Sequence, residues 1–146
     1  MIFYYTRSKK TLVFVKAFSE ILNISIKEIE TDINNKGILS LFWLILTKRA
    51  YKVNNIPNEF PQEIYIASPI WGGRLAAPVL YFLQYADLKN TKVNLILTAS
   101  MPTVKYCENA KKYLDKLDLI PGKVYIFAND KEPDIETIKE HILSYE

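Results

Sequence analysis

The first residues whose types and spacing could do chemistry form a short polar segment after an apolar N-terminal run. This segment holds three hydroxyl and three cationic side chains, namely Thr6, Arg7, Ser8, Lys9, Lys10 and Thr11. Hydroxyl groups, backbone N–H groups and the positive end of a helix together favour an anion, most naturally a phosphate. A simpler role for Thr11 or Ser8 is to cap the helix that follows. The glycine spacing of P-loops and of dinucleotide-binding loops is absent from the segment.

A second candidate segment combines an aromatic ring with two glycines. Its residues are Ser68, Pro69, Ile70, Trp71, Gly72, Gly73 and Arg74. Glycine weakens packing, so a core role poorly explains a tryptophan directly before two glycines. The pattern makes sense if Trp71 offers a flat apolar face while Gly72 and Gly73 let the backbone approach a planar ligand. An ordinary half-buried Trp71 is the alternative.

Other chemistry-bearing residue types are scarce. The single cysteine excludes an internal disulfide, and the single histidine removes most zinc sites. Cys107 has no histidine nearby in the sequence, so we expect a half-buried structural thiol. We expect His141 at the surface or at a helix end. The sequence therefore predicts neither a catalytic side chain nor a metal site.

Strands and helices that alternate along the chain must position these segments. Five apolar runs are typical of buried strands, at residues 2–6, 24–29, 63–68, 92–98 and 123–128. Apolar residues at helical spacing predict four helices, around residues 14–22, 79–86, 110–117 and 133–144. Pro121-Gly122 is predicted to be a turn, and Pro133 an early residue of the last helix.

This alternation predicts an α/β domain with a parallel sheet and helices on both faces. Sheets of this kind bind ligands beyond the carboxyl ends of their strands, where the strand order reverses. The segments that follow the first, third and fourth predicted strands are 6–11, 68–74 and 98–103. We therefore expect the candidate residues to meet at one edge of the sheet.

The segment Gly37–Tyr51 has no counterpart elsewhere in the chain. Residues Ile38–Leu46 are apolar on nearly all sides, and Lys48 and Arg49 follow them. A helix of this kind should be buried on more than one side, so we expect a crossover helix over the sheet. The alternatives are a homodimer or partner surface near the ligand site, or transient contact of Trp43 and the basic end with a membrane surface.

Composition indicates one domain spanning residues 1–146, with 49% hydrophobic and 24% charged residues. The apolar runs fall short of the ~20 residues that a membrane span requires, and the N-terminus lacks a signal-peptide pattern. We therefore expect a cytoplasmic protein without stable membrane insertion. The net charge is +3, and residues 1–52 carry nine Lys or Arg against four Asp or Glu. Without a sustained basic stripe, we expect no nucleic-acid partner.

Taken together, the three loops resemble those of the flavodoxin-like family, in its short-chain, FMN-binding form. The hydroxyl loop after the first strand, the Pro-x-Trp-Gly-Gly segment after the third and the polar loop after the fourth carry the resemblance. It covers nearly the whole chain. It implies a three-layer flavodoxin-like sandwich, with a five-stranded parallel sheet in the order 2-1-3-4-5.

The resemblance also implies FMN as the cofactor and the loop that holds its phosphate. Thr6, Ser8 and Thr11 match the hydroxyl positions of the family's phosphate loop. Lys9 stands where the family usually has glycine. A positive φ there would strain the backbone, and the lysine amine beside a dianionic phosphate could offset that cost.

For the flavin ring, the resemblance implies contacts from the two later loops. Trp71 matches the aromatic residue of the family's first ring-binding loop, and the backbone partner of flavin N5 is expected at Gly72 or Gly73. The polar loop after the fourth strand would lie along the pyrimidine edge of the ring. Its residues are Thr98, Ala99, Ser100, Met101 and Pro102.

The function implied is electron transfer through noncovalently bound FMN. One alternative is an FMN-dependent NAD(P)H:quinone-type reductase. The other is a binding module that kept the fold and lost the flavin, which Lys9 suggests. Flavodoxins are typically acidic and this chain is mildly basic, so the identity of a redox partner does not carry over from the family.

Overall fold

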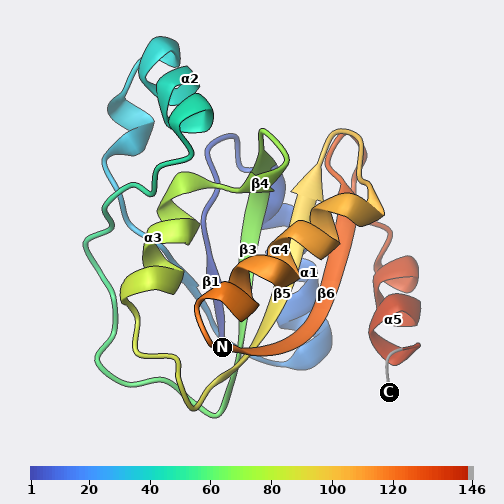
Figure 1. Cartoon of the computed structure of the whole chain (residues 1–146). Coiled ribbons are helices and arrows are strands. Elements are labelled where there is room, and N and C mark those ends of the chain that lie inside the picture. The colour runs from blue at the N-terminus through green and yellow to red at the C-terminus, as the bar shows by residue number, and fades with distance from the viewer. Residues whose placement is uncertain (145–146) are drawn as a thin grey trace.

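The computed structural model describes residues 1–144, and its strands and helices alternate along the chain (Figure 1). The strands are β1 (Ile2–Tyr4), β2 (Ile26–Glu28), β3 (Glu63–Trp71), β4 (Arg74–Leu75), β5 (Lys92–Ala99) and β6 (Ile120–Ala128). The helices are α1 (Lys10–Leu22), α2 (Ile38–Thr47), α3 (Ala77–Tyr85), α4 (Val104–Lys116) and α5 (Ile135–Leu143), with a 3₁₀ turn at Ile33–Asn35.

Five of the strands form a parallel sheet in the order β2-β1-β3-β5-β6. Counted without β4, this is the predicted order 2-1-3-4-5. The apolar pattern did not predict β4, a two-residue strand that pairs antiparallel with the end of β3. Gly72 and Gly73 have φ of +56° and +81°, so the chain reverses between Trp71 and Arg74 in two residues. The hairpin extends β3 beyond its predicted end.

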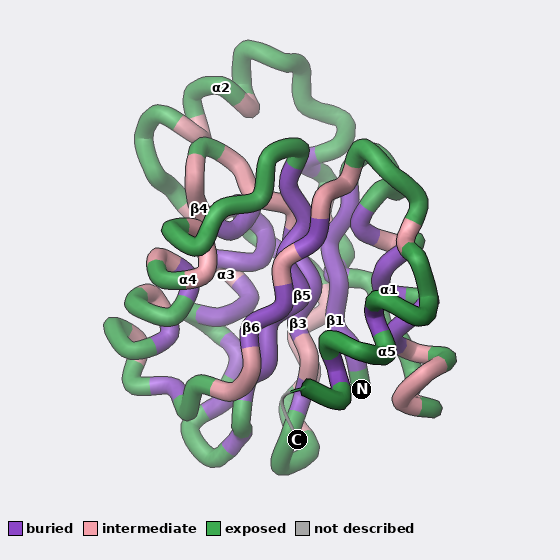
Figure 2. Tube along the Cα trace, turned by 90° about the vertical axis from the view of Figure 1, so that its right-hand side faces the viewer, coloured by how far each residue is buried: buried purple, intermediate pink, exposed green. Residues whose placement is uncertain are grey.

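Helices cover both faces of the sheet, which gives the three predicted layers (Figure 2). Side chains that alternate along each strand separate the core into two halves. On one face Ile2, Ile96 and Tyr125 pack with α1 and α5. On the other face Phe3 and Leu97 pack with α3 and α4. The apolar spacing of these four helices predicted this arrangement.

Helix α2 differs from the prediction, because it is not buried over the sheet. Its residues Ile38, Leu39, Phe42, Trp43 and Leu46 are between 55% and 80% exposed. The helix lies at the end of the sheet where β3 meets β4, beyond α3 (Figure 1).

The extended segment after α2 explains why the helix is displaced. Val53 is buried on the α3 side of the sheet, and Phe60 packs against Phe3 and Phe82 with ring centroids 5.5 and 5.9 Å away. This segment fills space on the sheet face that we expected the helix to cover.

Strand β6 corrects a second prediction, because Pro121 and Gly122 belong to it rather than to a turn. The pairing of β5 with β6 shifts after Val93, so one residue of β5, Asn94, faces two of β6. The buried Asn94 amide donates to Glu63 Oε1 and accepts from the Lys123 N–H, both at 2.8 Å. A Cβ on residue 122 would overlap the Asn94 amide group, which explains the glycine.

The boundaries of two secondary-structure elements also differ from those predicted. Strand β2 is limited to Ile26–Glu28, and all three of its residues are exposed. Pro133 precedes the last helix instead of lying inside it, because Asp134 is the N-cap. The Asp134 carboxylate accepts from the Glu136 N–H at 3.2 Å.

The bulge at Asn94 predicts a marked loss of stability on substitution. Asn94→Ala leaves the Lys123 N–H without its buried acceptor, so we expect the free energy of unfolding to fall by about 1–3 kcal/mol. Urea unfolding followed by circular dichroism measures the change. Asn90→Ala, at an exposed turn, is the control, and equal midpoints for the two variants would contradict the role given to Asn94.

The exposure of α2 generates a second prediction, for two phenylalanines. Phe42 is 57% exposed and Phe82 is fully buried. Phe82→Ala should lower the free energy of unfolding by about 3–5 kcal/mol, because it opens a cavity in the core. Phe42→Ala should change it by about 0.5 kcal/mol or less. A comparable loss in both variants, measured by the same unfolding assay, would show that α2 is buried.

Candidate functional site

The structure brings the three predicted segments together at one end of the sheet (Figure 1). The hydroxyl oxygens of Thr11 and Thr98 are 2.8 Å apart, which joins the segment after β1 to the end of β5. The rings of Tyr5 and Trp71 meet edge to face, with centroids 5.5 Å apart and planes at 86°. This contact joins the same segment to the end of β3. Residues that follow β1 thus lie against the ends of β3 and β5 at one edge of the sheet.

The segment between β1 and α1 holds a buried hydroxyl group and an uncapped helix. Thr6 is buried, and its hydroxyl oxygen has no hydrogen-bond partner among residues 1–144. Lys9 is the N-cap of α1, and its side chain makes no capping hydrogen bond to the N–H groups of the first turn. Lys9 therefore occupies the N-cap position, rather than Thr11 or Ser8, which the alternative interpretation placed there. A buried donor beside free backbone donors forms the start of an anion site.

Lys9 has the left-handed backbone that its position in the loop suggested, with φ of +61°. For a residue with a Cβ this conformation costs roughly 1–2 kcal/mol relative to the right-handed region. The side chains of Arg7, Ser8, Lys9 and Lys10 are all exposed around the start of α1. The segment therefore places three cations where an anion would lie.

Thr11 differs from the other hydroxyl residues of this segment. It is buried, and its hydroxyl is within hydrogen-bond distance of the Thr98 hydroxyl, which is also buried. At the end of β5, Thr98 and Ala99 are buried while Ser100 and Met101 are exposed. In the third segment, the residues at the end of β5 are therefore buried, and the residues that follow them are exposed.

The hairpin after β3 is held from two sides by groups that the sequence analysis missed. The carbonyl oxygen of Ile45 in α2 accepts from the Arg74 guanidinium at 2.8 Å, and the Asn109 amide in α4 donates to the Gly73 carbonyl at 3.3 Å. A Cβ on Gly72 would lie 2.6 Å from the Cγ2 atom of Ile45. Contact with α2 therefore explains part of the need for glycine at this turn.

The base of the same hairpin is fixed by a buried serine. The Ser68 hydroxyl donates to the Pro69 carbonyl at 2.8 Å and accepts from the Ala76 N–H at 3.0 Å. Pro69, Ile70 and Trp71 are half-buried above it. These two hydrogen bonds link the end of β3 to the residue before α3, and Trp71 stays partly accessible.

Tyr5 is the ionisable group that burial perturbs most clearly near these loops. Burial raises the pKa of Tyr5 to about 12, with Arg7 opposing the shift and Glu28 adding to it. Its hydroxyl remains protonated at neutral pH and donates to Asn34 Oδ1 at 2.8 Å. Tyr5 therefore supports the Trp71 ring as a neutral group.

Cys107 and His141 lie as the sequence predicted. Cys107 is half-buried in α4, and burial raises the pKa of its thiol, so the reactive thiolate is disfavoured. His141 is exposed in the last turn of α5, with its Nδ1 2.9 Å from the Thr137 carbonyl oxygen. Within residues 1–144, no three His, Cys, Asp or Glu side chains gather as a metal site, and no helix is long and apolar enough to cross a membrane.

Comparison with protein-family models and with curated protein sequences found no match. Solved structures do match. A candidate flavoprotein from Bacteroides uniformis has a TM-score of 0.79 and 19% identity, with 98% of this chain and 96% of that chain covered. A flavoprotein from Lactobacillus acidophilus, solved in complex with FMN, has a TM-score of 0.60 and 22% identity, with 86% and 90% covered.

An archaeal flavodoxin also matches, with a TM-score of 0.54, 9% identity, and 95% of this chain and 90% of that chain covered. At these identities the likeness concerns the fold. The strand order, the two helical layers and these matches agree with the resemblance found in the sequence. This protein has the flavodoxin-like fold.

Proposed function

We propose that this protein binds FMN noncovalently at the carboxyl ends of β1, β3 and β5 and acts in electron transfer. The observation that carries the proposal is the buried Thr6 hydroxyl, which has no partner among residues 1–144 and lies just before the uncapped start of α1. A phosphate would accept hydrogen bonds from this hydroxyl and from the free N–H groups of the first turn.

The charges around the segment after β1 fit the phosphate of FMN. Arg7, Lys9 and Lys10 are exposed there, and the first turn of α1 has no acidic residue. A dianion in this position would be attracted by all three cations and by the helix dipole. The left-handed Lys9 directs the backbone into α1 as glycine would, so the strain it carries is compatible with a phosphate loop.

The two later loops would hold the flavin ring. Trp71 offers a partly accessible ring that Tyr5 supports at its edge, and Gly72 and Gly73 provide backbone groups next to it. Ser100 and Met101 form the exposed tip of the loop opposite. Bound here, FMN would supply the redox chemistry, while these residues would bind it and exclude water from one face.

The side chains around the three loops favour a carrier over a reductase. The side chains of residues 6–11, 68–74 and 98–102 themselves are hydroxyl, cationic and apolar groups, and the phenol of Tyr5 stays protonated. Groups of this kind bind and orient a cofactor, and none of them is a carboxylate or an imidazole, the side chains most often used as general acid or base. NADPH added to the flavin-loaded protein should therefore leave the flavin oxidised. Rapid bleaching would indicate a reductase.

The freshly purified protein should be yellow and should release a flavin on denaturation. Lys9→Glu should weaken FMN binding by about tenfold or more, because it places a carboxylate beside the phosphate. Titration of the apoprotein with FMN, followed by flavin fluorescence, measures the affinity. Lys36→Glu makes the same charge change at another exposed lysine and should have a much smaller effect.

Two results would count against this proposal. A colourless protein that does not take up added FMN would indicate a binding module that lost the flavin. Equal losses of affinity in the two variants would remove the role given to Lys9.

A homodimer through the segment Ile38–Leu46 is one of the alternatives that the sequence left open, and the exposed face of α2 is the surface on which it depends. Sedimentation velocity should show a dimer, and Leu39→Glu/Trp43→Glu should convert it to a monomer because the apolar face is lost. Leu143→Glu, at an exposed leucine of α5, should leave the dimer intact. A monomeric wild-type protein would contradict the prediction.

A further inference from the structure

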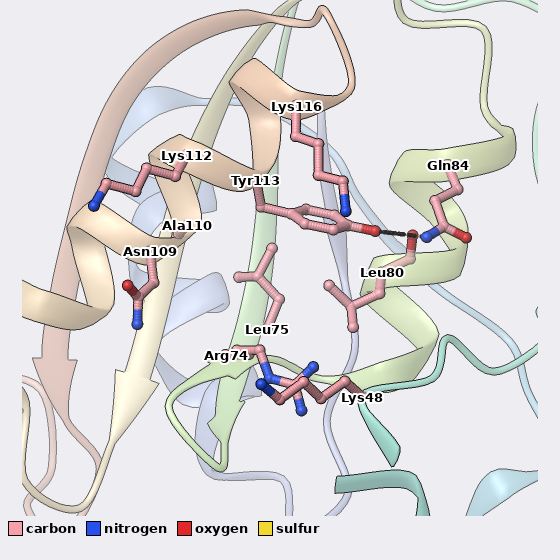
Figure 3. A pocket seen from close by; sticks show the side chains of 10 residues that line it. All are labelled: Lys48, Arg74, Leu75, Leu80, Gln84, Asn109, Ala110, Lys112, Tyr113 and Lys116. Carbon is pink, nitrogen blue, oxygen red and sulfur yellow. Dashed lines mark hydrogen bonds between the residues drawn. The ribbon is translucent and has the colours of Figure 1, made fainter. Parts of the chain in front are cut away.

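A second cationic site lies on the α3 and α4 side of the β3–β4 hairpin, in a cavity of about 470 Å³ (Figure 3). Helices α3 and α4, strand β4 and the end of α2 enclose it. Its lining residues are Lys48, Arg74, Leu75, Leu80, Gln84, Asn109, Ala110, Lys112, Tyr113 and Lys116. The volume lies within the range of about 300–1,000 Å³ that is usual for small-molecule sites.

The lining carries four cations and no carboxylate. Lys48, Arg74, Lys112 and Lys116 come from three different elements, and none of them forms an ion pair within residues 1–144. Like charges around one cavity repel, and a bound polyanion relieves that repulsion. Arginine and lysine are the side chains that proteins use most for phosphates. Four cations match a ligand with more than one negative charge.

Helix α4 turns one face toward the cavity. Asn109, Lys112, Tyr113 and Lys116 follow the i, i+3, i+4, i+7 spacing of one helical face, and all four line the cavity. The acidic residues Glu108 and Asp115 of the same helix are not part of the lining. Of the four lysines of α4, Lys112 and Lys116 line the cavity, while Lys105 and Lys111 lie outside the lining.

The remaining lining groups suit a flat organic ring with polar edges. Leu75, Leu80 and Ala110 supply apolar surface. The Gln84 amide donates to the Tyr113 hydroxyl at 2.8 Å, which orients both groups at the edge of the cavity (Figure 3). A side-chain amide has two donors and an acceptor oxygen, so Gln84 retains capacity for a ligand.

We propose that this cavity binds a nucleotide with at least two phosphates. The phosphates would lie among Arg74 and the lysines, and the base would lie on the apolar surface with its edge toward Gln84. A ligand with a single carboxylate would leave most of the four cations unpaired. An uncharged ring would leave all four unpaired. The proposal does not depend on FMN binding.

Isothermal titration calorimetry with ADP, adenosine and inorganic pyrophosphate tests the assignment. ADP should bind at least about tenfold more tightly than adenosine, which lacks the phosphates, and than pyrophosphate, which lacks the ring. Absence of binding by ADP would overturn the proposal. Pyrophosphate binding as tightly as ADP would overturn the nucleotide assignment, because the ring would then contribute nothing.

Charge-reversal variants locate the site. Lys112→Glu/Lys116→Glu should weaken ADP binding by about tenfold or more. Lys111→Glu/Lys89→Glu changes the net charge equally at exposed lysines outside the lining and should leave the ADP affinity close to that of the wild type. Lys9→Glu should likewise leave ADP affinity unchanged. Equal weakening in the control, or weakening by Lys9→Glu alone, would place ADP elsewhere and overturn the proposal.

Discussion

The rest of the structure depends on the central strand, β3. It hydrogen-bonds to β1 on one side and to β5 on the other, and both pairings are parallel. Because parallel strands end at the same edge, the register of β3 decides which side chains meet there. The strand is nine residues long, so its last residue, Trp71, lies beside the segment that follows β1. The glycine turn then reverses the chain into β4, which contacts α4. The candidate flavin site and the cationic cavity both begin at this hairpin.

Much of the fold could be predicted because the apolar pattern of parallel strands and crossover helices is local. The runs after Met1, Gln62 and Thr91 are apolar enough to be strands buried on both faces, and the strand order followed from the family resemblance. The parts that could not be predicted depend on contacts between distant residues. The bulge at Asn94 requires Glu63 and Lys123, which lie 31 and 29 residues away.

Helix α2 also shows that a local pattern does not determine contacts between distant residues. Its composition indicated burial, yet the extended segment through Val53 and Phe60 covers the sheet face instead. A local apolar pattern does not predict which of two apolar segments packs on a given face of the sheet, because both could pack there. In the site, the residues placed at the loops by sequence do meet, whereas Asn109 and Ile45 were missed because each acts on the hairpin from a different helix.

The hairpin also connects the two proposed ligand sites. Asn109 donates to the Gly73 carbonyl, and Arg74, which pairs with Trp71 across the hairpin, donates to Ile45 of α2. Both side chains line the cationic cavity. A phosphate that draws Arg74 away from Ile45 would loosen the contact between α2 and the turn at Gly72. The position of the turn at Gly72 and Gly73 and the lining of the cavity therefore rest on the same two side chains, Asn109 and Arg74.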